Sequence, residues 1–280
     1  MRVVSWNLAY RTGPAARTEG EFLAGLDPFP DLVLFQEANP RSIEDVCSEA
    51  RLDWLRLAVD LRTAQPDDTP VRRRGVAIAG RGLQPLATQL LTDVPLPERT
   101  LIATLPMAGG EMIAASYHAP PGVSWFEKKP QQAVAFARWL ATVEQPVLFG
   151  ADANTPLVDA LDFVNTRTHW HSGMSRLRGA PGDDLLVGHT KIHSLNDALR
   201  VWLAAHPDDL AARAKVAPNG PLALSHRTGK RRNSPGIDRR YDAVWISDHF
   251  AVSGVAYAYD ESIAAGSDHA AVIVDLGLVS

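Results

Sequence analysis

The chain of 280 residues is long enough to bury a substantial core, and its composition, 46% hydrophobic and 21% charged, is typical of a soluble globular protein. Its formal net charge of -4 excludes a polycation that would hold nucleic acid by overall charge alone, so any such contact must come from local basic clusters. The single cysteine, Cys47, excludes an internal disulfide and a thiol cluster for zinc or iron-sulfur binding.

The beginning of the chain gives no sign of export or membrane insertion. Residues 1–7 run directly into a predicted strand, without the apolar region and cleavage site of a secretory signal peptide. No uninterrupted apolar stretch approaches the roughly 20 residues that span a bilayer. We therefore expect one cytoplasmic domain over residues 1–280, without a membrane span and without an obligate protein partner.

The first two predicted strands each end in a polar side chain. The apolar run 3–6 leads to Asn7, and the apolar run within residues 31–37 leads to Glu37. Asn7 could cap a turn or ligate a cation, and Glu37 could simply be solvated, so neither residue alone decides between a structural and a functional role. Helical patterns follow the two strands, over residues 15–26 and about 40–50.

Five further strands are predicted before the middle of the chain, over residues 54–61, 75–79, 84–91, 100–105 and 111–118. Arg99 stands directly before the fourth of these strands, where it could reach a neighbouring strand end. His118 ends the fifth, and the proline-rich loop after it would hold its ring in one orientation. A histidine in this place can be structural or catalytic.

The central segment of the sequence is the strand that begins at Val147. It follows the clearest predicted helix, over residues 124–143, whose apolar residues share one face. We expect Gly150 to turn the backbone so that Asp152 and Asn154 emerge together at the end of the strand. A carboxylate and a carboxamide at this spacing suit cation binding and the orientation of water. An Asx turn is the simpler explanation of these two residues on their own.

The second half of the chain is less regular. A short helix is expected after Pro156 to about residue 163, and residues 164–192 have the composition of surface loops. A capping-box-like start at Ser194 predicts a helix through residue 203. The remaining predicted elements are a helix over residues 208–215 and strands over residues 241–247, 250–259 and 270–276.

The densest positive charge of this acidic chain lies just before the strand predicted over residues 241–247. It includes Arg231, Arg232 and Arg240. A solvated basic loop is the default interpretation, and contact with the phosphates of a substrate is the alternative.

Polar residues at strand ends recur along the chain in seven motifs: Ser5-Trp6-Asn7, Phe35-Gln36-Glu37, Glu98-Arg99, Tyr117-His118-Ala119-Pro120, Gly150-Ala151-Asp152-Ala153-Asn154, Arg240-Tyr241-Asp242 and Ser267-Asp268-His269. In this order, over essentially the whole chain, the set resembles the endonuclease/exonuclease/phosphatase superfamily, which has the deoxyribonuclease-I-like fold. The resemblance implies an α/β (α+β) class and a four-layer α/β/β/α sandwich of two mainly antiparallel sheets flanked by helices. The active site would lie at one edge, and residues from about 155 to 237 would form an insert containing loops and helices.

The resemblance also implies roles for individual residues. Asn7, Glu37 and Asp268 would hold Mg²⁺, with Mn²⁺ as a possible substitute, because hard oxygen donors suit such cations. The catalytic residues would be His118, Asp152, Asn154, Asp242 and His269. The substrate-binding residues would be Arg99, Arg231, Arg232 and Arg240.

Within the catalytic set, the resemblance assigns different tasks. His269 would hold the scissile phosphate or activate the attacking water, with Asp242 as its carboxylate partner. Asp152 and Asn154 would position the water and the phosphate, and Asp152 could share in a second metal site. His118 would bind the phosphate or act on the side of the leaving group.

The function implied is divalent-metal-dependent hydrolysis of phosphodiester bonds in nucleic acid, as an endonuclease or exonuclease, by in-line attack of an activated water. The alternative is a phosphatase or phosphodiesterase of a small phosphorylated metabolite or lipid headgroup, and a non-catalytic binding module is the third possibility. The abasic-site branch is disfavoured because no lysine follows Glu37 closely and because the expected Tyr-x-Pro-Asn segment is Tyr117-His118-Ala119-Pro120.

Overall fold

The computed structural model describes residues 1–63, 74–121, 125, 127–168, 182–229 and 235–279. Its first sheet contains six strands in the order β13-β14-β1-β2-β4-β3. β1 and β2 run parallel, and every other neighbouring pair is antiparallel. The strands are β1 (Arg2–Asn7), β2 (Leu32–Ala38), β3 (Trp54–Leu57), β4 (Gly75–Gly80), β13 (Phe250–Ala258) and β14 (Ala271–Leu278).

The second sheet also contains six strands, in the order β5-β6-β7-β8-β12-β9. Here too one pair is parallel, β7 with β8, and the remaining pairs are antiparallel. The prediction of two mainly antiparallel sheets is therefore confirmed. The strands are β5 (Ala87–Leu90), β6 (Thr100–Met107), β7 (Gly110–His118), β8 (Val147–Asp152), β9 (Asn196–Asp197) and β12 (Asp242–Ile246).

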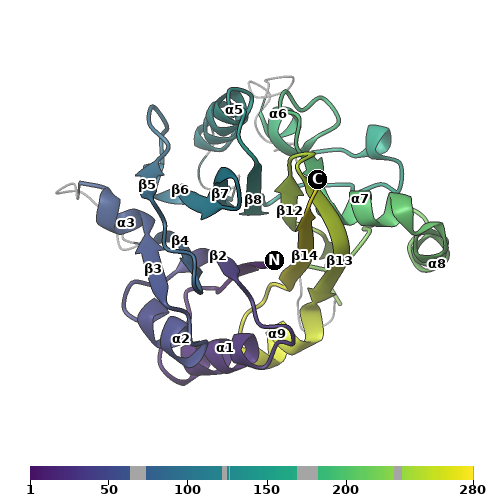
Figure 1. The fold of residues 1–280 in the computed structure, drawn as a ribbon. Coiled ribbons are helices and arrows are strands. Elements are labelled where there is room, and N and C mark those ends of the chain that lie inside the picture. The colour runs from purple at the N-terminus through teal and green to yellow at the C-terminus, as the bar shows by residue number, and fades with distance from the viewer. Residues whose placement is uncertain (64–73, 122–124, 126, 169–181, 230–234, 280) are drawn as a thin grey trace.

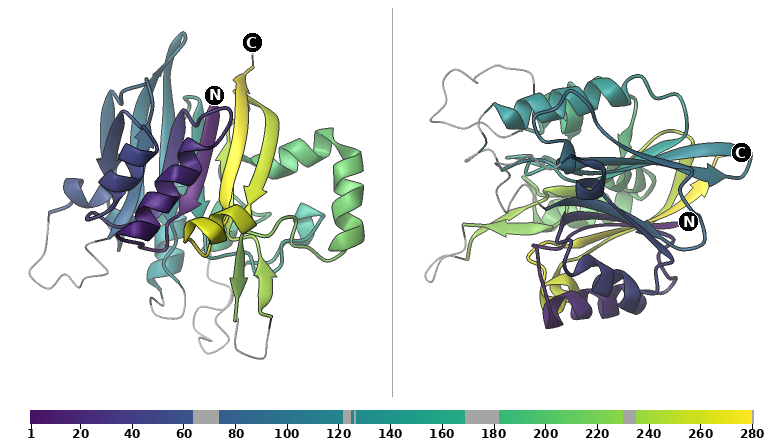
Figure 2. Two further views of the ribbon diagram at one scale, coloured as in Figure 1. Left: turned by 90° about the horizontal axis from the view of Figure 1, so that it is seen from below. Right: turned by 90° about the vertical axis from the view of Figure 1, so that its left-hand side faces the viewer.

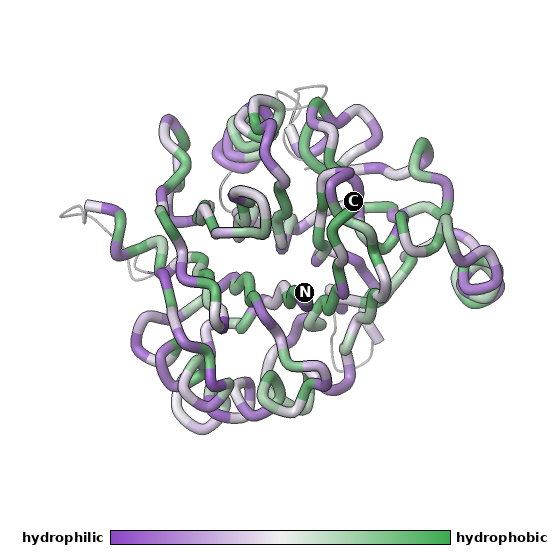
Figure 3. Tube along the Cα trace, in the orientation of Figure 1, coloured by the Kyte–Doolittle hydropathy of each residue, from purple (hydrophilic) through white to green (hydrophobic). Residues whose placement is uncertain are grey.

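Three hydrophobic clusters hold the four layers together. Strand residues such as Val3, Leu34 and Leu148 form the core between the two sheets. The outer face of the first sheet packs against α1 (Pro14–Ala24), α2 (Ile43–Glu49) and α9 (Tyr259–Ala265), and the outer face of the second packs against α5 (Lys128–Leu140). Figure 1 shows the two sheets between these helices, and Figure 3 shows hydrophobic residues concentrated along the strands. The four-layer sandwich is thus confirmed.

The two sheets approach each other closely at Gly150. The residue lies within β8, which continues to Asp152, so the expectation that the backbone turns at Gly150 is wrong. A Cβ atom at this position would lie 2.5 Å from Ser5 Oγ and 2.8 Å from Leu34 Cδ1, both on the facing sheet. Glycine is needed here because a side chain would force the sheets apart.

Other differences from the predicted elements have local causes. The strand expected over residues 54–61 ends at Leu57 and continues as α3 (Ala58–Leu61), since a short apolar run fits a helix as well as a strand. The helix expected between Pro156 and residue 163 is absent from this described segment, which has only the 3₁₀ turn η2 (Phe163–Asn165), capped by Asp162. Two short helices were not predicted: α6 (Asp183–Val187) and α9.

The segment expected to be an insert carries the peripheral helices. They are α7 (Ala198–Ala205), which begins after Asp197 as N-cap rather than at Ser194, and α8 (Pro207–Val216). An unpredicted hairpin follows, formed by β10 (His226–Thr228) and β11 (Ile237–Arg239). Figure 2 shows this hairpin projecting at the end of the sandwich opposite both termini. The division into a single domain and an insert stays a prediction.

No helix within the described ranges combines the length and the apolar character needed to cross a bilayer.

Candidate active site

Polar side chains from both sheets meet at the edge of the sandwich opposite the termini. Strand β1 ends at Asn7, β7 at His118 and β8 at Asp152. His118 lies opposite Asp152 in the parallel pair, and Asp152 lies opposite Asp242 in the antiparallel pair. His269 precedes β14 by two positions. These residues gather because parallel strands end together and an antiparallel neighbour begins where they end.

Asp152 is the hub of this cluster. Its side chain is buried, and its Oδ2 accepts a hydrogen bond from Asn7 Nδ2 at 2.8 Å. Its Oδ1 accepts from the backbone N–H of Asn154 at 2.9 Å, and the amide of Asn154 donates to the carbonyl of Ala119 at 3.0 Å. Asn154 has a φ of +48°, which asparagine tolerates better than most residues. These donors fix the orientation of the carboxylate.

Asp242 and His269 form a buried pair. Asp242 Oδ2 lies 2.9 Å from His269 Nδ1, and because a carboxylate accepts, Nδ1 carries the proton and Nε2 is the free end of the ring. Burial by itself lowers the pKa of His269, but Asp242 and Asp152 outweigh burial and raise it well above its ordinary value. The backbone of His269 is held by Trp6 Nε1, which donates to its carbonyl at 3.0 Å. The pair therefore presents a cationic imidazole.

His118, unlike His269, is held in its neutral form. Nη1 of Arg99 lies 2.7 Å from Nδ1 of His118 and 3.2 Å from its Nε2, and a guanidinium can only donate, so the nearer Nδ1 is the acceptor. Burial and the charge of Arg99 lower the pKa of His118 well below its ordinary value. Its Nε2 lies 3.5 Å from Glu37 Oε1 and 3.6 Å from Asp152 Oδ2. His118 is thus a neutral ring between a cation and two carboxylates.

Glu37 occupies a strained position at the end of β2. Its φ is +50°, and the pairing of β2 with β4 shifts register between Phe35 and Ala38. This bulge interrupts the alternation of side chains along β2, and the Glu37 side chain lies beside His118. Burial, and then the charge of Asp152, raise the pKa of the Glu37 carboxyl to about 7.

The donor set fits a hard divalent cation. Asp268 also raises the pKa of Glu37, so the carboxylates repel one another, and a bound cation would relieve this repulsion. Within the described residues, two groups place three potential ligand atoms within 4.8 Å of one another: Asp152, Asp242 and His269, and His226, Asp268 and His269. Both ends of the Asn7 side chain are already hydrogen-bonded, to Asp152 and to the N–H of Ala9, so its role as a ligand stays a prediction.

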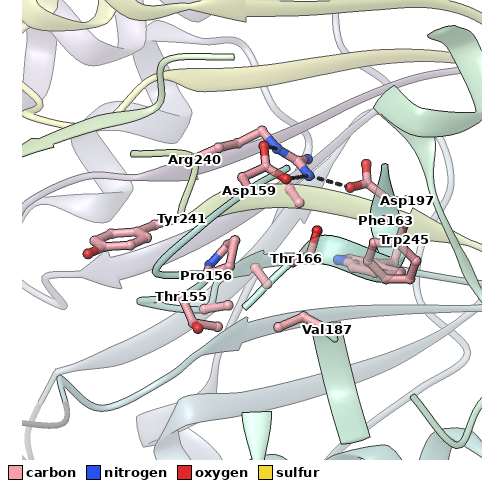
Figure 4. A pocket seen from close by; sticks show the side chains of 13 residues that line it. Thr155, Pro156, Asp159, Phe163, Thr166, Val187, Asp197, Arg240, Tyr241 and Trp245 are labelled. Atoms are coloured by element: carbon pink, nitrogen blue, oxygen red, sulfur yellow. Dashed lines mark hydrogen bonds and ion pairs between the residues drawn. The ribbon is translucent and has the colours of Figure 1, made fainter. Parts of the chain in front are cut away.

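Arg240 does not join the cluster, and its contact with substrate stays a prediction, because its guanidinium is already paired with carboxylates of the fold. Figure 4 shows its guanidinium paired with two carboxylates, at 2.7 Å from Asp159 and 2.6 Å from Asp197. Its side chain is buried by these contacts. The other two arginines of the basic segment, Arg231 and Arg232, lie outside the described residues.

The structure adds three residues that sequence patterns did not single out. Ser225 Oγ accepts from the N–H groups of Tyr241 and Asp242, at 2.8 and 3.1 Å, and so holds the strand start that carries Asp242. Lys129 Nζ donates to the carbonyl of Asn154 at 2.8 Å. His226 stacks on His269, with ring centroids 4.1 Å apart. No local signal distinguishes these residues from an ordinary loop serine, a solvated lysine or a basic-loop histidine.

No protein-family model matches the sequence, and no curated protein sequence is significantly similar to it. Solved structures are similar in fold. D. rerio TDP2 complexed with single-strand DNA product has a TM-score of 0.63 at 15% identity, covering 99% of this chain and 98% of that chain. The endonuclease domain of TRAS1, a telomere-specific non-LTR retrotransposon, has a TM-score of 0.58 at 16% identity, covering 100% and 99%.

A third similar structure is the endonuclease/exonuclease/phosphatase from Bacteroides vulgatus, with a TM-score of 0.62 at 15% identity and coverage of 99% of this chain and 98% of that chain. The three likenesses extend over nearly the full length of each chain. The chain therefore has the fold of the endonuclease/exonuclease/phosphatase, or deoxyribonuclease-I-like, superfamily.

Proposed function

We propose that the chain is a divalent-metal-dependent phosphodiesterase that hydrolyses nucleic acid at the Asp152 cluster. The observation that carries this proposal is the convergence of Asp152, the pair of Asp242 and His269, and Glu37 at one edge of the fold. The TDP2 structure with single-strand DNA product and the TRAS1 endonuclease domain support nucleic acid as the substrate class.

The cation would be held by oxygen donors of Glu37 and Asp268, with Asn7 beside them. These donors are of the type that Mg²⁺ prefers, and Mn²⁺ is expected to substitute. When bound, such a cation would offset negative charge that develops on the phosphoryl oxygens.

The residues around the phosphate would then have separate tasks. His269, kept protonated by Asp242, would donate from Nε2 to an oxygen of the scissile phosphate. Asp152 would orient the attacking water through the carboxylate that Asn7 and Asn154 hold in place. His118 would donate from Nε2 as a neutral ring, with Arg99 fixing its tautomer.

A small phosphorylated metabolite or lipid headgroup is the second candidate substrate. The observation that favours it is the burial of Arg240, which removes one of the basic residues expected to grip a polymer backbone. Such a substrate needs only a compact site at the strand ends. A cytoplasmic location remains a prediction from the sequence.

A substrate panel tests the proposal. Purified wild type and His269→Ala would be assayed on single- and double-stranded DNA, RNA and phosphomonoesters, with Mg²⁺, Mn²⁺ or a chelator. We expect metal-dependent cleavage of nucleic acid that falls by at least about 100-fold in His269→Ala. The matched control is His249→Ala, because His249 is exposed beyond the other end of β12.

The outcomes separate the candidates. Turnover of monoesters alone, still lost in His269→Ala, would keep the site and replace nucleic acid by a small substrate. Equal loss in His249→Ala would indicate a general effect on folding, and the absence of any metal-dependent turnover would overturn the proposal.

A further inference from the structure

His226 lies against the ring of His269 at the base of the hairpin formed by β10 and β11. The two imidazole centroids are 4.1 Å apart, and the ring planes are inclined by 21°. Tyr241 also stacks on His226, with centroids 6.0 Å apart and planes inclined by 23°. The hairpin segment that carries His226 thus supplies a ring to the proposed active site, although it is far from His269 in the sequence.

The backbone holds this ring firmly in place. Nδ1 of His226 lies 3.0 Å from the carbonyl oxygen of Asp268, which can only accept, so Nδ1 carries the proton. The N–H of Ala270 donates to the carbonyl of Ser225 at 2.7 Å, and His226 forms a β-bridge with His269. Because Ser225 also holds the N–H of Asp242, one short segment fixes both members of the Asp242 and His269 pair.

A shared metal ion explains this arrangement less well. One potential ligand atom each of His226, Asp268 and His269 lie within 4.8 Å of one another. However, lone pairs of imidazole nitrogens lie in the ring planes, and two nearly parallel rings direct them side by side rather than toward a common centre. Stacking instead restrains rotation of the His269 ring about its Cβ–Cγ bond, in addition to the hydrogen bond from Nδ1 to Asp242.

We propose that His226 is a positioning residue, whose stacked ring holds Nε2 of His269 in the direction from which it meets the substrate phosphate. The inference rests on the proposed function, since it assigns His269 its contact with phosphate. If His226 acts in this way, catalysis should depend on a planar ring at position 226 more than on the ring nitrogens of histidine.

The variants His226→Ala and His226→Phe test this inference. We expect His226→Ala to lower kcat by about 10- to 100-fold with little change in KM. A misaligned His269 would stabilise the transition state less, while contributing nearly the same to substrate binding. His226→Phe keeps a stacked ring and should restore most of kcat. The loss should vanish when His269→Ala is already present, because His226 acts through His269.

His206→Ala is the matched control. His206 also stacks on a ring, that of Trp202, with centroids 3.5 Å apart, but it lies between the peripheral helices α7 and α8. Thermal unfolding of all variants would show that each is folded. A wild-type kcat in His226→Ala would overturn the inference, and so would an equal loss in His226→Phe with a raised KM, which would make His226 a substrate ligand.

A second measurement does not require activity. The NMR resonance of the His269 Nδ1–H that bonds Asp242 should broaden or shift in His226→Ala and return toward its wild-type position in His226→Phe. If the wild type hydrolyses none of the substrates, the proposed function fails, and this resonance still decides whether His226 positions His269. An unchanged resonance in His226→Ala would contradict the inference.

Discussion

The two histidines of the site are held in opposite charge states by their neighbours. Burial and then the guanidinium of Arg99 keep His118 neutral, whereas the carboxylates around His269, Asp242 foremost, outweigh burial and keep it protonated. Two further site residues, Glu37 and Asn154, adopt positive φ angles. Each such conformation costs on the order of 1 kcal/mol, and the surrounding hydrogen bonds must offset it. Glu37 and Asn154 therefore lower the stability of the fold, while their backbone conformations help to fix the positions of the charged groups in the site.

Glu19 in α1 is a buried acid outside the site, and it predicts a pH dependence of stability. Neither of its carboxylate oxygens has a hydrogen-bond partner among the described residues. Burial raises its pKa to about 8 from an ordinary value of 4.5. Between these values the folded chain keeps a proton that the unfolded chain has lost. The free energy of unfolding should therefore fall as pH rises through this window, by up to about 1.4 kcal/mol per pH unit.

Urea unfolding at pH 6 and pH 9 would check this prediction. We expect both proteins to lose stability at the higher pH, because the raised pKa values of Glu37 and His269 act in the same window, and Glu19→Gln to lose less than the wild type. Glu21→Gln, an exposed change in the same helix, should behave like the wild type. Equal losses in the wild type and in Glu19→Gln would show that another group is responsible.

At the scale of elements, a buried charge network ties the peripheral segments to the sheets. Arg240 pairs with Asp159, which precedes η2, and with Asp197, which caps α7. It also donates to the hydroxyl of Tyr257 on β13, and Tyr257 in turn donates to the carbonyl of Asp242. The network therefore connects the loop, helix and strands that surround the start of β12.

Removing Arg240 should destabilise the fold rather than weaken substrate binding. Arg240→Met would leave two carboxylates buried without their main cation, at an expected cost of about 3–5 kcal/mol in the free energy of unfolding. Arg227→Met is the control, because the pair of Arg227 and Asp238 is largely exposed and its loss should change the free energy of unfolding little. Urea unfolding measures both. A stable Arg240→Met variant with a raised KM would restore the original assignment to substrate binding.

The sequence patterns located the strands that carry the site but not the partners of charged residues. Asn7, Glu37, His118 and Asp152 were identified because each ends a short apolar run, and strand ends gather at a sheet edge. The role of Arg240 could not be foreseen, since Asp159 lies 81 positions away and nothing local marks it as a partner. His226 was missed for the same reason, because stacking on His269 depends on the path of the whole hairpin.

At the scale of the whole molecule, the chain termini and the proposed active site lie at different ends of the sandwich. Both termini lie at one end of the sheets (Figure 2), and β1, which begins beside the N-terminus, ends at the other with Asn7 in the polar cluster. Gly150, where the two sheets approach closely, is two residues from Asp152 on the same strand. The packing of the sheets therefore helps to fix the position of Asp152. We propose that this edge hydrolyses phosphodiesters with the help of a divalent cation.

The most direct test is the rate at which chelator-treated protein cleaves a single-stranded oligonucleotide before and after Mg²⁺ is added, for the wild type, Asp152→Asn and Asp208→Asn. We expect the wild type to cleave only with Mg²⁺, and Asp152→Asn to lose at least about 100-fold in rate because the orienting carboxylate is gone. Asp208→Asn, an exposed change on α8, should match the wild type. Cleavage that persists in chelator, or an Asp152→Asn variant as active as the wild type, would contradict the account.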